Sequence, residues 1–285
     1  MTSTATTSGD RHPATPVPAT KTLSPRVGPV EGIQQSLTLA WRTIVQVRHN
    51  PWELGDFSFQ PIMFVLLFTF VYGGAIAGSW QDYLTFMLPG MIVMNMLFVT
   101  MYVGQGLNTD LTKGVFDRLR SLPIARWAPL AGRILADQVK QAWSIVLVLA
   151  VGMILGFRLG TNLAGLLGAT VLLLVFALAF SWVSVLVGVV AKDPERVQIF
   201  GFTALFPVTF VSNVFVPTQS MPGWLQAFVK VNPVSILSDA CRGLMLGEPW
   251  YTGAVTRPVL QSLLWALAIA VVFAPLSLWA LKRKV

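Results

Sequence analysis

The sequence has few of the residues on which enzymes and metal proteins depend. One of its 285 residues is cysteine (Cys241) and two are histidine, so we expect neither an internal disulfide framework nor a cluster of metal ligands. No H-E-x-x-H, no G-x-S-x-G and no membrane-facing Ser-His-Asp set occurs, which argues against an intramembrane protease or a lipid hydrolase. The phosphate loop G-x-x-x-x-G-K-[ST] is also missing. We therefore expect no enzyme activity and no cofactor in this chain, and any ATP that it uses must be hydrolysed elsewhere.

Charged residues are scarce as well. They make up 11% of the chain, whereas soluble domains have about a quarter, and 54% of the residues are hydrophobic, with a mean hydropathy of +0.67. So few charges cannot cover a water-soluble surface. The composition predicts an all-α integral membrane protein.

Six apolar runs are each long enough to cross a bilayer, because about twenty residues at a rise of ~1.5 Å per residue cover a hydrocarbon layer of ~30 Å. The interiors of these runs lack charged residues, and Lys140 is the first residue of the third run. This argues against an ion-coupled relay, so an ATP-independent secondary transporter or channel is the weaker alternative. The predicted spans are residues 59–78, 84–107, 140–157, 164–190, 199–216 and 258–281.

Two different segments precede the first span. Residues 1–30 are rich in Thr, Ala, Pro and Ser, which predicts a disordered tail. Residues 31–50 predict an amphipathic helix that lies in the membrane interface. The alternative is a helix packed on a soluble core, and the rest of the chain offers no such core. The apolar face of the predicted interfacial helix is formed by Ile33, Leu37, Trp41, Ile44 and Val47.

The distribution of Lys and Arg predicts the orientation. Sixteen of the twenty lie in the tail and the interfacial helix, the connections after the second and fourth spans, and the C-terminus. The positive-inside rule makes this face cytoplasmic, with both termini inside. The net charge of +8 then follows from topology, and nucleic-acid binding is not needed to explain it.

The cytoplasmic connection from 108 to 139 predicts a short helix that ends at Pro123 and a second helix that begins at Pro129. The alternative is a basic segment that binds anionic lipid headgroups, which would need the positive charge but not Pro and Gly at ordered positions. The string KGVFDRLRSLPIAR at 113–126, with GRILAD at 132–137, resembles the cytoplasmic loop of type-2 ATP-binding-cassette permeases, above all the bacterial daunorubicin/doxorubicin-resistance permeases. The strings FPVTFVSNVFVP and NPVS, at 206–217 and 232–235, resemble the same family.

This resemblance implies a permease subunit of an ATP-driven exporter of lipophilic drugs or lipids in the bacterial plasma membrane. It implies two copies of a cytoplasmic ATPase subunit, which would carry ATP and Mg, and a second permease copy or a sister permease. It also implies that a coupling helix contacts the ATPase through Val115, Phe116, Asp117, Arg118, Leu119 and Arg120. A membrane anchor that transports nothing is a further alternative.

The extracellular segment 217–257 predicts two short helices, the second starting at Asn232-Pro233 and ending at Gly247. Neither is long enough to span, so we expect a re-entrant hairpin, which the resemblance implies closes the outer end of the path. The Asp239–Arg242 pair is expected to be structural, and an exposed pair would contribute only ~0–1 kcal/mol. Candidate gate residues are Trp224, Phe228, Asn232, Asp239 and Arg242.

Polar and thioether side chains in two spans are candidates for a translocation path. Met and Phe recur at spacings of three and four in the second span, which suits either a path for apolar substrates or ordinary helix packing. Uncharged polar groups in the second and fifth spans are either contacts between helices or polar points of the path. The candidates are Met87, Met91, Met94, Asn95, Phe98, Thr209, Ser212 and Asn213.

Overall fold

A computed structural model describes residues 29–49, 51–115, 128–248 and 250–284, and this part of the chain is helical with short connections. The first half of the described chain comprises α1 (Pro29–His49), α2 (Pro51–Leu67), a π-helical turn η1 (Phe68–Tyr72), α3 (Gly73–Ala77), α4 (Trp80–Thr112) and α6 (Ala128–Ile154). It is followed by α7 (Leu163–Val190), α8 (Pro194–Phe210), a 3-10 turn η2 (Thr218–Ser220), α9 (Gly223–Val231), α10 (Pro233–Met245) and α11 (Thr256–Lys284).

Within the described residues, five helical segments are long and apolar enough to cross a membrane: Ser58–Ala77, Trp80–Thr112, Ala128–Ile154, Leu163–Val190 and Thr256–Lys284. The all-helical membrane fold is therefore confirmed. The remaining predicted span, 199–216, corresponds to α8, whose 17 residues reach about 26 Å and which ends at Phe210. It ends six residues earlier than the apolar run. At this end the side-chain amide of Asn232 donates to the carbonyls of Val208 and Val211, at 2.8 and 2.9 Å, and so supplies partners that a longer helix would take from its own amides.

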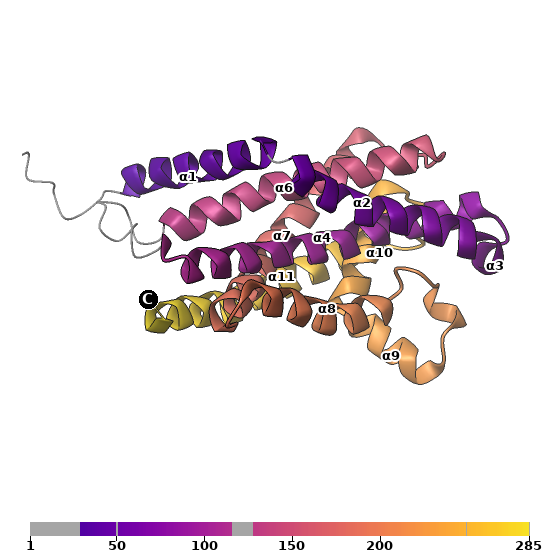
Figure 1. Cartoon of the computed structure of the whole chain (residues 1–285). Coiled ribbons are helices and arrows are strands. Elements are labelled where there is room, and N and C mark those ends of the chain that lie inside the picture. The colour runs from indigo at the N-terminus through magenta and orange to yellow at the C-terminus, as the bar shows by residue number, and fades with distance from the viewer. Residues whose placement is uncertain (1–28, 50, 116–127, 249, 285) are drawn as a thin grey trace, which may run out of the picture.

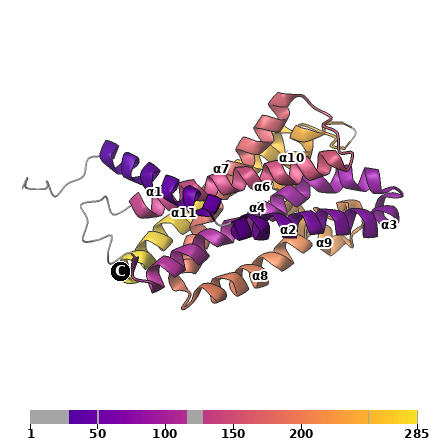
Figure 2. The same ribbon diagram turned by 45° about the horizontal axis from the view of Figure 1, so that its top comes forward.

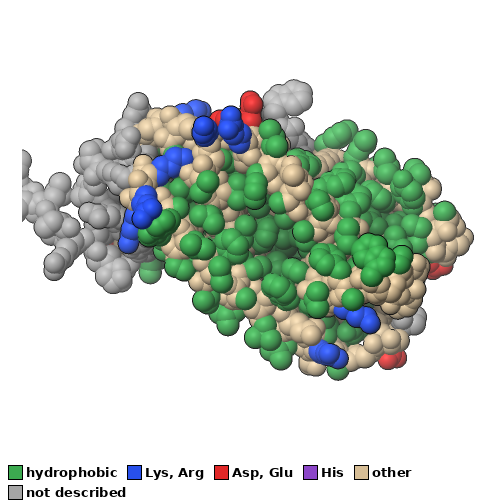
Figure 3. Space-filling model, turned by 90° about the horizontal axis from the view of Figure 1, so that it is seen from below, with side chains coloured by type: hydrophobic (Ala, Val, Ile, Leu, Met, Phe, Trp, Pro, Cys, Tyr) green, Lys and Arg blue, Asp and Glu red, His purple; other side chains and the backbone are tan. Residues whose placement is uncertain are grey.

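The helices run side by side, so that the molecule has two distinct ends (Figure 1). The C-terminal end of α4, the start of α6 and the end of α11 lie at one end, and α3 and α9 lie at the other, as the turned view also shows (Figure 2). Figure 3 shows one face with apolar side chains over its middle, Lys and Arg gathered mostly toward the first end, and fewer at the second. This is the arrangement expected of a molecule that crosses a bilayer along its long axis.

Helix α4 is the centre of the core, and α6, α7, α8 and α10 all pack on it. It approaches α7 closely at Gly104, where a Cβ atom would lie 2.1 Å from the carbonyl oxygen of Ser184. The close approach lets the Ser184 hydroxyl accept from the Gly104 amide at 2.8 Å, and Asn108 donates to the carbonyls of Gly188 and Ala191. Small residues therefore set the distance between these two helices.

Helix α1 has two apolar faces with different roles. The small residues Gly32, Ser36 and Ala40 are buried against α6, where a Cβ atom on Gly132 would clash with the carbonyl oxygen of Ser36. The large side chains of the predicted membrane face are exposed, with Ile33 54%, Leu37 56% and Trp41 66% accessible. Ile44 and Val47, the other two members of this face, lie outside the described side chains. The exposed stripe has the apolar character that an interfacial helix needs.

Candidate functional site

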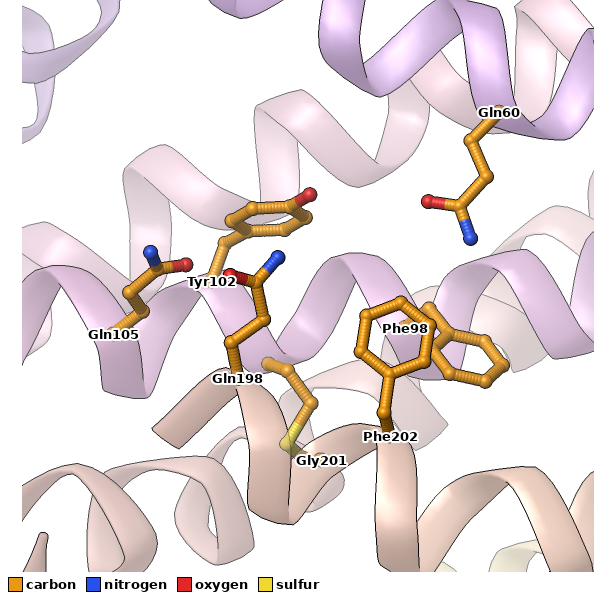
Figure 4. A pocket seen from close by; sticks show the side chains of 8 residues that line it. Gln60, Phe98, Tyr102, Gln105, Gln198, Gly201 and Phe202 are labelled. Atoms are coloured by element: carbon orange, nitrogen blue, oxygen red, sulfur yellow. The ribbon is translucent and has the colours of Figure 1, made fainter. Parts of the chain in front are cut away.

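A groove lies between α2, α4 and α8 (Figure 4). Gln60 reaches into it from α2, while Gln198 and Phe202 reach it from α8 and face the α4 side chains. The rings of Phe98 and Phe202 are 5.3 Å apart between centroids. Four residues of α4 line it, at spacings that place them on one face of that helix: Phe98, Met101, Tyr102 and Gln105.

A second hollow shares Gln60 and Phe98 with the first, so the two adjoin along the same side of α4. Its other walls are Pro61 and Phe64 of α2 and the α4 side chains Met91, Met94 and Asn95. The two hollows have about 320 and 230 Å³ of empty space, which includes space open to the outside. From here on, the groove means both hollows together.

All the described residues that line this groove are uncharged. Aromatic rings and thioethers supply apolar, adaptable contacts, and amide groups and the Tyr102 hydroxyl supply a few hydrogen-bonding points. Such a surface suits a hydrophobic molecule that carries some hydroxyl or carbonyl groups, because apolar pockets with a few polar points are the usual sites for small molecules.

An aromatic cluster lies beyond the groove at the η1 turn. Phe64, which lines the groove, is followed by Phe68, whose ring stacks on Phe215 with 4.4 Å between centroids. Phe210 at the end of α8 packs on Phe215 at 4.9 Å. Phe68 begins the π-helical turn Phe68–Tyr72, and its ring also lies 6.3 Å from that of Phe210 on α8. The apolar lining therefore continues from the groove into a packed aromatic layer.

The predicted path residues divide into three groups. Met91, Met94, Asn95 and Phe98 line the groove, and Asn95 also donates to Ser144 of α6, so it joins two helices as well. Met87 is buried in the core and lines neither hollow.

The other three predicted path residues lie at the end of α8. Thr209 donates its hydroxyl to the Leu205 carbonyl at 2.7 Å and Ser212 donates to the Thr209 carbonyl, so both are buried contacts within the chain and not part of the groove. Asn213 lies in a separate polar cluster with Asp239.

That cluster is built around Arg242, whose side chain is only 3% exposed. Its Nε donates to the Phe86 carbonyl at 2.9 Å, its Nη2 to the carbonyls of Asn213 and Val214, and its Nη1 to Oδ1 of Asp239 at 3.1 Å. The guanidinium also lies 4.0 Å from the centre of the Phe86 ring. The predicted pairing of Asp239 with Arg242 is present. The arginine is nevertheless buried, because α10 packs on α4 and the Arg242 guanidinium donates to carbonyls of α4 and of the segment after α8.

Asp239 differs from its partner in facing outward, with 37% of its side chain exposed. Its Oδ1 also accepts from the Asn213 amide at 2.7 Å. Partial burial raises the pKa of Asp239 above its ordinary value, and the adjacent Arg242 charge opposes that shift.

The remaining candidate gate residues have different surroundings. Trp224 and Phe228 of α9 are exposed, whereas Asn232 is buried between α9 and α10. Its side chain caps α10 by accepting from the Val234 amide at 2.9 Å and also holds the end of α8. Asn232 is thus a structural junction of α8, α9 and α10.

Of the predicted coupling contact, only Val115 is described, and it is half-buried; Phe116, Asp117, Arg118, Leu119 and Arg120 lie outside the described residues. The helices that flank this segment are joined by an ion pair between Asp110 of α4 and Arg133 of α6. Arg133 reaches Asp110 across Gly106, where a Cβ atom would lie 1.7 Å from the guanidinium. This pair ties the two ends of the connection together.

Several groove residues were not predicted from the sequence. Gln60, Tyr102, Gln105 and Gln198 are polar residues near the ends of apolar runs, and tyrosine is common there because it suits the membrane interface. Tyr102 and Gln105 continue the same helical face as Phe98 by four and three residues, and that spacing is the one signal by which they could have been found.

Comparison with known proteins decides the family. The family model described as ABC-2 type transporter matches residues 34–246, which cover most of the helices above. The chain belongs to the ABC-2 type transporter family. The daunorubicin resistance ABC transporter permease protein DrrB1 of Streptomyces coeruleorubidus is 39% identical over 254 residues, covering 88% of this chain and 87% of the relative. The probable doxorubicin resistance ABC transporter permease protein DrrC of Mycobacterium tuberculosis is 28% identical over 229 residues, covering 76% and 78%.

Membership in this family makes the chain the membrane permease subunit of an ABC exporter. ATP hydrolysis resides in a separate nucleotide-binding subunit, which agrees with the missing phosphate loop. The recognition made from the loop at 113–126 is therefore confirmed.

Proposed function

We propose that this ABC-2 permease exports lipophilic drugs or lipids across a bacterial plasma membrane, and that the groove between α2, α4 and α8 is part of their path. The observation that carries the substrate proposal is the groove's lining of aromatic rings, thioethers and uncharged amides. The names of the relatives support it, since two of them are described as resistance permeases for daunorubicin and doxorubicin.

The groove is open along one side, and its flanks are apolar. Phe59 and Met63 of α2, and Ile199 and Phe206 of α8, are large apolar side chains exposed on either side of it. A second permease copy, or a sister permease, placed against these flanks would turn the groove into an enclosed passage. We propose such a pair, each member with six spans when α8 is counted as one.

The same proposal gives the molecule an orientation. The Lys-rich and Arg-rich end, with the C-terminus and the ends of α4 and α6, would be cytoplasmic, and α9 and α10 would form an extracellular hairpin at the other end. Two ATPase subunits would then contact the connection between α4 and α6 at residues 115–120. Movement of that connection would reach the groove through the Asp110–Arg133 pair and through α4 itself.

A drug-efflux assay tests the groove. Cells that express the permease with its ATPase subunit should accumulate less daunorubicin than cells without them, and Phe98→Ala should restore accumulation because it removes a ring from the middle of the groove. Phe70→Ala is the matched control, since Phe70 is an exposed phenylalanine of the preceding span that does not line the groove. Equal efflux by all three proteins would contradict the proposed path.

The same cells separate the competing functions. Efflux that persists after the ATPase subunit is inactivated would favour the ATP-independent secondary transporter or channel. No efflux of any lipophilic compound, with both subunits present in the membrane, would favour a membrane anchor.

A further inference from the structure

A third cavity lies apart from the groove, around the Asp239–Arg242 cluster, and has about 600 Å³ of empty space, including space open to the outside. It is bounded by Phe86 of α4, by Asn213, by η2 and by the segment that follows α10. Unlike the groove, this outer cavity has a largely polar lining.

Arg242 gives the outer cavity no site for an anion. Four of its hydrogen-bonding interactions go to the carbonyls of Phe86, Asn213 and Val214 and to Asp239, and one face of the guanidinium lies against the Phe86 ring. A guanidinium has five N–H donors, so little donor capacity is left for a ligand. Its nearly complete burial leads to the same conclusion.

Asp239 is the charged group that the outer cavity can reach. In the part of the chain that the structure describes, its two side-chain hydrogen bonds, from Asn213 and from Arg242, both go to Oδ1 and neither goes to Oδ2. The carboxylate has four acceptor sites when ionised, and Oδ2 retains its own for a donor from outside. Among the described residues that line the cavity, Asp239 and Arg242 carry charge and the others do not.

Aromatic side chains complete the surroundings of this carboxylate. Trp250 and Tyr251 line the same cavity. Partial burial raises the pKa of Tyr251 above its ordinary value, and the negative charge of Asp239, which lines the same cavity, adds to that shift. Aromatic faces and a carboxylate are the two kinds of group that attract an organic cation.

We propose that the outer cavity is a binding site for an organic ammonium group, carried by a lipophilic substrate on the outward side of its path. The ammonium would donate to Oδ2 of Asp239, and Trp250 and Tyr251 would contact the cation and the apolar body next to it. This inference rests on the proposed function, because it specifies which lipophilic molecules the exporter prefers. It predicts selection for amines over neutral molecules of the same shape.

A matched pair of probes tests it: daunorubicin, which carries a primary amine, and its N-acetyl derivative, which is neutral at that nitrogen. Asp239→Asn removes the negative charge but keeps an oxygen that can accept from Arg242 and Asn213. We expect it to lower both efflux and binding of daunorubicin about tenfold, the effect of losing one charge-assisted hydrogen bond, and to change those of the N-acetyl derivative less than twofold. Binding is measured by the fluorescence anisotropy of the probe with purified permease in detergent.

Asp193→Asn is the matched control. Asp193 also pairs with an arginine three residues later, Arg196, but it caps the start of α8 and is not part of the outer cavity. Asparagine caps helices as well as aspartate does, so both probes should behave as they do with the unchanged protein.

The outcomes separate the two proposals. If Asp239→Asn lowers the binding and efflux of both probes equally, or of neither, the ammonium site is refuted while drug export stands. If the unchanged protein with its ATPase exports neither probe, the proposed function fails, and the binding measurement still decides the ammonium site. The ammonium site is then overturned if the anisotropy titrations give the same affinity for daunorubicin with the unchanged permease and with Asp239→Asn.

Discussion

At the scale of single residues, the surroundings of a side chain decide its role more than its type does. Arg242 and Arg196 are both arginines paired with an aspartate three residues earlier, yet one is buried between α10 and α4 and the other is 62% exposed on α8. The sequence predicted the first pair from its spacing but not its burial, because the carbonyls of Phe86 and Asn213 that bind the guanidinium come from distant segments. Long-range contacts of this kind leave no local pattern.

The two arginines give a direct prediction about stability. Arg242→Lys should lower the free energy of unfolding by about 1–3 kcal/mol, because an ammonium cannot reach three carbonyls and a carboxylate with the geometry of a guanidinium. Arg196→Lys should change it by less than about 0.5 kcal/mol, since its pair is exposed. Thermal unfolding of the purified permease in detergent measures both, and equal shifts would contradict the role given to Arg242.

At the scale of helices, small residues determine how closely the elements pack. Apolar runs predicted where the long helices lie, since hydropathy is a property of each segment alone. The runs did not predict that α1 would bury Gly32, Ser36 and Ala40, nor that only part of the methionine face of α4 would reach the groove. Those outcomes depend on which neighbouring helix covers each face, and periodicity within one helix cannot supply that information.

Two glycines test this account of packing. Gly104→Ala should lower the melting temperature and the folded yield, because its Cβ would lie 2.1 Å from the Ser184 carbonyl oxygen and force α4 away from α7. Gly168→Ala is the control in α7, where the added Cβ would make ordinary contacts at 3.7 Å and alanine favours helix. The account is wrong about this interface if Gly104→Ala is as well tolerated as Gly168→Ala.

A third glycine tests the connection between motor and groove. Gly106→Ala should displace Arg133 from Asp110, because the new Cβ would occupy the space of the guanidinium. We expect more ATP to be hydrolysed per molecule of daunorubicin exported, with the folded yield preserved if Arg133 moves outward. A ratio of transport to hydrolysis equal to that of the unchanged protein would show that the Asp110–Arg133 pair does not transmit movement.

At the scale of the whole molecule, the charge distribution makes a prediction about orientation. Cys241 is fully buried, so a cysteine introduced at the surface can be labelled with little background. Ser220→Cys in η2 should react with an impermeant maleimide in intact cells, whereas Lys282→Cys near the C-terminus should react only after the membrane is opened. The reverse pattern would invert the proposed topology.

The central claim is that this permease contains the path but not the motor. Its most direct test is daunorubicin uptake into inside-out vesicles that contain the permease and its ATPase subunit, compared with vesicles whose ATPase has lost the phosphate-loop lysine. The account predicts uptake that requires ATP and both subunits and that disappears with the altered ATPase. Uptake without ATP, or with the altered ATPase, would contradict it.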